Sequence, residues 1–176
     1  MSLEALVKAQ KILARRKAAK LISDPKVYGY IRTSKTEREQ KYSSDYQERA
    51  ITDFYEMSVK NVNSPMHGVA FGGFFLDRVS GSKEIIDRTA GRVMLNRLMP
   101  GDFLICYNMD RLSRGIYDSA NVLQLFSMFG IVLMTTDGET DLSSTIGQTM
   151  AMVKVGFAQH ERERLIDRTK RAHAQR

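Results

Sequence analysis

The chain has 176 residues, enough for one domain with an appended element, and its 43% hydrophobic and 27% charged residues are ordinary for a globular protein. No apolar run approaches the roughly 18 residues of a membrane-spanning helix, and no apolar segment with a cleavage site follows the basic N-terminus, so we expect a cytoplasmic protein without membrane contact. The net charge of +7 is uneven: residues 1–26 carry seven Lys/Arg and two acids, residues 160–176 carry six and three, and the middle is close to neutral.

The first predicted element is a basic helix over residues 3–22, which "SDPK" ends. Its apolar residues recur at broadly helical spacing: Leu3, Leu6, Val7, Ile12, Leu13 and Leu21. Such a helix can contact DNA phosphates or another subunit without sequence preference, or can simply be solvated.

From Val27 onward, short apolar runs alternate with helical segments. The predicted strands are "VYGYI", "VAFGGFFLD" with a bulge at its Gly pair, "FLICY" and "IVLMTT". The predicted helices begin near Ser44, cover "GRVMLNRLM", and cover "IYDSANVLQLFSMFG". "RVSGSKEIIDRTA" has no clear period and predicts a mobile connection, whereas Cys106 in "FLICY" predicts a core thiol.

This alternation predicts an α/β fold with a mostly parallel central sheet and helices on its faces, and functional groups at strand ends. A single long helix is predicted from about Thr145 to His173. Its first half is apolar over much of its circumference, which favours an oligomer interface over a docked terminal helix. We therefore divide the chain into a basic helical extension (1–25), a catalytic domain (26–143), and an interface helix with a basic arm (144–176).

Familiar nucleotide and metal signatures are absent from the sequence. It has no Walker-type loop, no GxGxxG after the first strand, no CxxC and no HExxH, and only three scattered histidines. We therefore expect no cofactor and no metal.

Arginines instead lie at the ends of predicted elements: Arg32 follows the first strand, Arg88 lies in the mobile connection, and Arg111 and Arg114 follow the third strand. Guanidinium groups match phosphate oxygens in pairs and stay charged, so a cluster of them can stabilise a phosphoryl-transfer transition state. Ser34, two residues after Arg32, would pair a nucleophile with a cation. Each residue alone is more often a surface salt bridge or a loop hydroxyl, but the set at several strand ends favours phosphoryl transfer.

Five motifs in order resemble those of the catalytic domain of the serine site-specific recombinases, the resolvase/invertase family. They are "YIRTS", "SSDYQ", "FLDRVSGS" followed by "DR", "DRLSR", and "GFAQHERERLIDRT", and they extend from about Lys26 to Arg171. Two differences are that the segment between Ser34 and Gln47 is longer than usual and that Ser113 replaces a frequent glycine. Members normally continue into a helix-turn-helix domain, so we expect DNA recognition beyond Arg176 or elsewhere.

The resemblance implies that Ser34 attacks a DNA phosphodiester, becomes joined to the 5′ phosphate and releases a 3′ hydroxyl. After subunit exchange that hydroxyl would reseal a recombinant strand, without ATP or metal. The four arginines would bind phosphate, Gln47 and Asp77 would support them, and Asp110 is the acid before the arginine pair. The implied partners are double-stranded DNA and a homodimer that assembles into a tetramer. The residues implied to contact DNA are Arg162, Arg168, Lys170 and Arg171, while Asp167 and its neighbours would meet the partner subunit.

Two other functions fit parts of this pattern. A non-catalytic DNA-binding or regulatory protein on the same scaffold would have little physical reason to keep Ser34 together with four arginines. A metal-dependent nuclease is disfavoured because the sequence has no acidic cluster.

Overall fold

The computed structural model describes residues 3–18, 24–34, 43–80, 83–113 and 116–136. The elements, in chain order, are α1 (Leu3–Ala18), β1 (Lys26–Thr33), α2 (Ser44–Lys60), β2 (Ala70–Arg78), the 3-10 helix η1 (Ile85–Asp87), α3 (Thr89–Arg97), β3 (Phe103–Cys106), α4 (Met109–Leu112), α5 (Ile116–Met128) and β4 (Val132–Thr135). The helix predicted from about residue 145, and the boundary predicted at 143/144, lie outside the described residues.

The four strands form one parallel sheet in the order β2-β1-β3-β4, which confirms the predicted α/β class. The chain runs from β1 to β2 at one edge, then returns across β1 to β3. The direction of winding therefore reverses between β1 and β3. In sheets of this kind ligands bind outside the carboxyl ends of the strands at that point.

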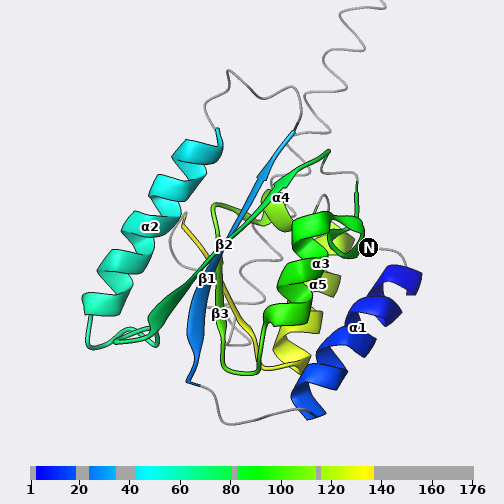
Figure 1. Cartoon of the computed structure of the whole chain (residues 1–176), viewed down its shortest axis with the longest axis horizontal. Helices are drawn as coiled ribbons and strands as arrows, with labels where there is room; N and C mark the ends of the chain where they lie inside the picture. The colour runs from blue at the N-terminus through cyan, green and yellow to red at the C-terminus, as the bar shows by residue number, and fades with distance from the viewer. Residues whose placement is uncertain (1–2, 19–23, 35–42, 81–82, 114–115, 137–176) are drawn as a thin grey trace, which may run out of the picture.

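Helices cover both faces of the sheet (Figure 1): α2 lies on one side, and α3 and α5 lie on the other with α1 beside them. Two apolar clusters result, one under α2 around Val27, Ile31 and Ile51, and a larger one shared by the sheet with α1, α3 and α5. Because both faces are covered, β1 is buried along its whole length after Lys26.

The bulge predicted at the Gly pair of β2 is confirmed. The register passes from Val27 opposite Phe71 to Tyr28 opposite Gly73, so Gly72 has no counterpart in β1. Gly73 has φ 113°, which only glycine adopts readily. Cys106 is a buried free thiol, as predicted.

The connection after β2 differs from the mobile segment that we predicted. Ile85 and Ile86 form part of η1 and are buried, and Arg88 after them is 1% exposed. Two adjacent isoleucines give no helical or strand period, yet both side chains belong to the larger apolar cluster. None of the helices in the described ranges is long and apolar enough to cross a membrane.

Candidate active site

Three arginines from different elements are buried at the carboxyl ends of β1 and β3. Arg32 is the last but one residue of β1 and is 5% exposed, Arg88 caps the N-terminus of α3 and is 1% exposed, and Arg111 lies on α4 and is 7% exposed. Three buried arginines therefore gather positive charge at this edge of the sheet, where an anion can bind.

The three side chains are joined through main-chain carbonyl groups. Arg88 Nη1 donates to the carbonyl of Arg111 at 2.8 Å, and Arg111 Nη1 donates to the carbonyl of Arg32 at 3.3 Å. Arg32 donates from Nη1 to the Val79 carbonyl at 3.2 Å and from Nη2 to the Asp110 carbonyl at 3.3 Å. These acceptors fix the guanidinium groups without neutralising their charge.

A buried tyrosine links Arg88 to a carboxylate. The Tyr30 hydroxyl accepts from Arg88 Nη1 at 2.9 Å and donates to Asp77 Oδ2 at 3.0 Å. Burial raises the pKa of the Tyr30 phenol well above its usual value, although the nearby Arg88 charge opposes this shift. Tyr30 therefore stays protonated and acts as a hydrogen-bond relay rather than as a base.

Asp77 also holds the start of α3. Its Oδ1 accepts from the Ala90 N–H and its Oδ2 from the Gly91 N–H, both at 2.9 Å. The negative carboxylate at a helix N-terminus satisfies two otherwise unpaired donors. Asp77 thus fixes both the relay through Tyr30 and the helix that follows Arg88.

Gln47 is fully buried on α2 and clamps the main chain of Arg32. The Arg32 N–H donates to Gln47 Oε1 at 3.3 Å, and Gln47 Nε2 donates to the Arg32 carbonyl at 3.1 Å. Ser34, half-buried, comes two residues later, directly after β1. The clamp therefore fixes the strand end from which Ser34 projects.

The structure thus brings together Arg32, Arg88 and Arg111 with Gln47 and Asp77, and it places Ser34 beside them in the chain. Asp110 is exposed at the start of α4, and its described contact is through its carbonyl, not its carboxylate. The other predicted site residues lie outside the described part of the chain: Arg114, Arg162, Asp167, Arg168, Lys170 and Arg171.

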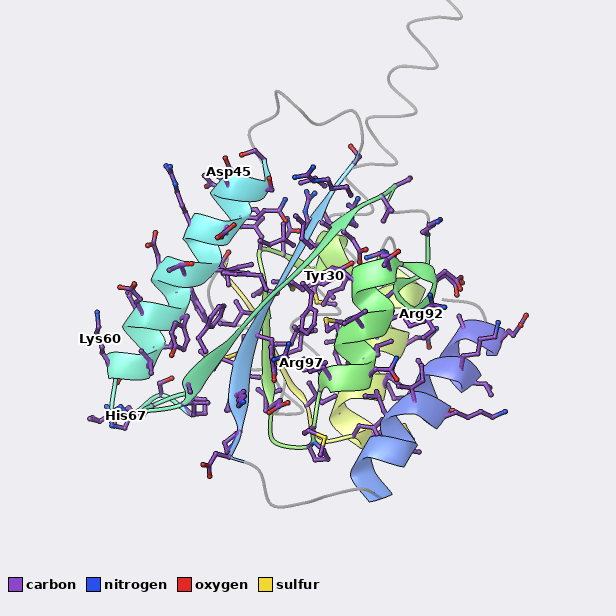
Figure 2. The ribbon with its side chains drawn as sticks, viewed as in Figure 1. Tyr30, Asp45, Lys60, His67, Arg92 and Arg97 are labelled. Carbon is purple, nitrogen blue, oxygen red and sulfur yellow. The ribbon has the colours of Figure 1, made fainter. Side chains whose placement is uncertain are left out.

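Tyr30 is the site residue that sequence reasoning missed. In "VYGYI" it reads as one more apolar residue of a strand, and Figure 2 shows it on the α3 side of the sheet. The available signal was its position two residues before Arg32, which places both side chains on one face of the strand.

The arrangement is suited to bind an anion with tetrahedral or planar oxygens. Within the described ranges no three His, Cys, Asp or Glu side chains are grouped to hold a metal ion. The guanidinium forks are preorganised by main-chain acceptors and helix packing, which is what stabilisation of developing negative charge requires.

The chain matches a known protein family over most of its length. The sequence model of the family described as "Resolvase, N terminal domain" matches residues 27–176. Among curated relatives, the Tn917 resolvase of Enterococcus faecalis is 30% identical over 121 residues, which cover 69% of this chain and 64% of that protein. The Tn3 resolvase of Escherichia coli is 26% identical over 144 residues, covering 82% and 68%. The serine recombinase gin of Escherichia phage Mu is 32% identical over 95 residues, covering 54% and 48%.

The chain therefore spans about two thirds of the length of these resolvases and about half that of the phage protein. Among solved structures, a resolvase family site-specific recombinase from Streptococcus pneumoniae is similar with a TM-score of 0.51 and 22% identity. The similarity covers 86% of this chain and 97% of that one, and it supports the fold alone.

Proposed function

The chain belongs to the family of resolvase N-terminal domains, and we propose that it is the catalytic part of a serine site-specific DNA recombinase. The proposed substrate is double-stranded DNA that carries the recombination site. Curated relatives that are named resolvases and serine recombinases support this activity.

One observation carries the proposal: three buried guanidinium groups surround the strand end that presents Ser34. The main-chain carbonyls and the Tyr30 hydroxyl described above hold these guanidinium groups in place, and the low-dielectric surroundings of a buried site strengthen their attraction for an anion. A DNA phosphate is such an anion, and its negative charge increases as a nucleophile attacks.

In the proposed reaction, Ser34 Oγ forms a bond to the phosphorus while the bond between phosphorus and the 3′ oxygen breaks. Ser34 loses its proton, and the leaving 3′ oxygen takes one up as a hydroxyl. The reverse attack by a 3′ hydroxyl from another strand end restores the phosphodiester and frees Ser34. One P–O ester replaces another at each step, so no ATP is consumed.

Trapping of the covalent intermediate tests this function. We expect the protein, incubated with supercoiled DNA carrying its recombination site and quenched with detergent, to give a protein–DNA adduct joined at a 5′ phosphate. Ser34→Ala should abolish the adduct, whereas the matched control Ser44→Ala, at the start of α2, should retain it. Absence of an adduct from the parent protein, or an adduct that survives Ser34→Ala, contradicts the proposal.

Assembly and DNA contacts beyond the site form a separate part of the proposal. A dimer that assembles into a tetramer is supported by the apolar first half of the segment from residue 145. Cross-linking with and without DNA tests this assembly, since a species that stays monomeric on DNA contradicts it.

The basic end of the chain supports DNA phosphate contacts at Arg162, Arg168, Lys170 and Arg171. We also propose that Arg114 binds phosphate, that the domain boundaries lie at 25/26 and 143/144, and that the protein is cytoplasmic, where DNA is accessible.

A further inference from the structure

Helix α1 precedes the part of the chain that matches the family, because the match begins at residue 27 and α1 ends at Ala18. It is nevertheless packed into the fold. Ala5, Ala9 and Leu13, spaced four residues apart on one face of α1, are 4%, 0% and 2% exposed and belong to the larger apolar cluster. Figure 1 shows α1 running beside α3 and α5.

Besides α3 and α5, α1 contacts η1, the turn that leads directly into Arg88. Ile85 and Ile86 of η1 are 2% and 4% exposed and lie in the same apolar cluster as Ala5 and Ala9. Lys8, on the exposed side of α1, is near enough to Glu84 and Asp87 for both to raise its pKa slightly, after the larger effect of its hydrogen bond and charge interaction with Glu4. Helix α1 therefore lies against η1.

Helix α3 also contacts η1. A Cβ on Gly91 would lie 2.2 Å from the Ile85 carbonyl oxygen, so η1 and α3 are in direct main-chain contact. The turn therefore contacts both α1 and α3. The position of η1 decides where the Arg88 guanidinium lies, because Arg88 directly follows η1. Its Nε also donates to the carbonyl of Lys83, which precedes η1, at 2.9 Å.

We infer that α1 is a positioning element for Arg88, acting through the packing of Ala5 and Ala9 against η1. The expected effect of α1 on activity rests on the proposed function, whereas the expected effect of α1 on the position of η1 does not. A displacement of about 1 Å in a preorganised group can lower a rate by about a hundredfold, so the packing of a remote helix is able to control the reaction.

The test compares the same substitution on the two sides of α1. Ala9→Leu inserts volume where the helix is fully buried, and Ala14→Leu places the same side chain where the helix is exposed. In folded protein at saturating supercoiled DNA that carries the recombination site, we expect Ala9→Leu to form the covalent adduct about tenfold or more slowly, with DNA affinity changed by less than about twofold. Ala14→Leu should match the parent in the rate of adduct formation and in DNA affinity. Ala9→Ser, which nearly preserves the side-chain volume, should form the adduct at the parental rate.

Hydrogen exchange provides a readout that does not depend on DNA. The Asp87 and Arg88 amides donate to the Glu84 and Ile85 carbonyls in this turn. We expect both amides to exchange faster in Ala9→Leu and at the parental rate in Ala14→Leu. If the parent protein forms no adduct, the proposed function fails, while this exchange result still decides the inference about η1.

The inference is overturned if folded Ala9→Leu keeps both the parental rate and the parental exchange at these amides. If Ala9→Leu does not fold, Ala9→Gly, which removes the buried methyl group without adding volume, takes its place and is compared with Ala14→Gly on the exposed side. Equal exchange at Asp87 and Arg88 in folded Ala9→Gly and Ala14→Gly then overturns the inference.

Discussion

The Tyr30 hydroxyl connects the most buried arginine of the site to the carboxylate that starts α3. Removal of this single oxygen, in Tyr30→Phe, leaves an Arg88 donor and an Asp77 acceptor without their shared partner. Hydrogen bonds to charged groups contribute about 1.5–3 kcal/mol, so we expect a loss of this size in the free energy of unfolding, measured with urea, and slower adduct formation.

Tyr28→Phe is the matched control for that prediction. Tyr28 is also buried on β1, but its ring packs against Phe75 and Arg97, and its hydroxyl has no hydrogen bond within the described ranges. We expect little change in stability or rate. Equal effects of the two substitutions would show that the relay has no special role.

Gly91 gives a second test, in which the sign of the effect is decisive. In an exposed helix, Gly→Ala stabilises by about 1 kcal/mol through helix propensity. Here the added Cβ would overlap the Ile85 carbonyl oxygen, so Gly91→Ala should instead destabilise by about 1–3 kcal/mol in urea unfolding. A stabilised variant would mean that η1 and α3 separate easily.

Helix α2 contributes to the site through one side chain that replaces a missing strand neighbour. Gln47→Leu keeps the bulk but leaves the N–H and C=O of Arg32 without the amide that binds both. An unsatisfied buried polar group costs about 1–3 kcal/mol, and we expect a loss in this range together with slower adduct formation. Glu56→Leu, on the exposed side of α2, is the control and should leave the rate unchanged.

Strands, helices and their order could be predicted from the sequence because each has a strong local signal. "FLICY" and "IVLMTT" are short apolar runs between turn residues, and the helix beginning at Ser44 has a Ser cap whose side chain accepts from the Tyr46 N–H. The Gly pair of β2 likewise identified its bulge, because only glycine adopts the required backbone.

Contacts between distant segments had no such signal. The arginines could be selected by residue type and family motif, but their acceptors are main-chain carbonyls, which every residue carries and which become available only near the ends of strands and helices. Ile85 and Ile86 read as an irregular connection because their partner, α1, lies far away in the sequence. Periodicity showed that α1 has an apolar face, not which surface it covers.

The end of the sheet opposite the site is closed by a second buried carboxylate. Asp102 accepts from the Lys26 N–H at 2.9 Å and from the Met99 N–H at 2.8 Å, tying the start of β1 to the turn before β3. Burial raises its pKa, more than these N–H donors lower it. Because Asp102 lies at the opposite end of the sheet from the arginines, we expect it to stabilise the fold and to take no part in the reaction.

Asp102→Ala separates stability from activity across the fold. Two partly buried N–H groups lose their acceptor, so the free energy of unfolding should fall by about 1–2 kcal/mol in total. Because these groups lie at the amino ends of the strands, the rate of adduct formation at saturating DNA should stay at the parental value wherever the variant is folded. A large loss of rate in folded Asp102→Ala would mean that the two ends of the sheet are coupled.

The clamp of Gln47 on Arg32 has a consequence for association between chains. β1 pairs with β3 only as far as Tyr30, so the next residues of β1 extend past their neighbour and would offer open main-chain groups to any extended peptide. The Gln47 amide occupies the N–H and C=O of Arg32, as a neighbouring strand would. Side chains therefore protect the main chain of β1 beyond the end of β3 against strand addition, since Arg111 Nη1 donates to the same carbonyl of Arg32.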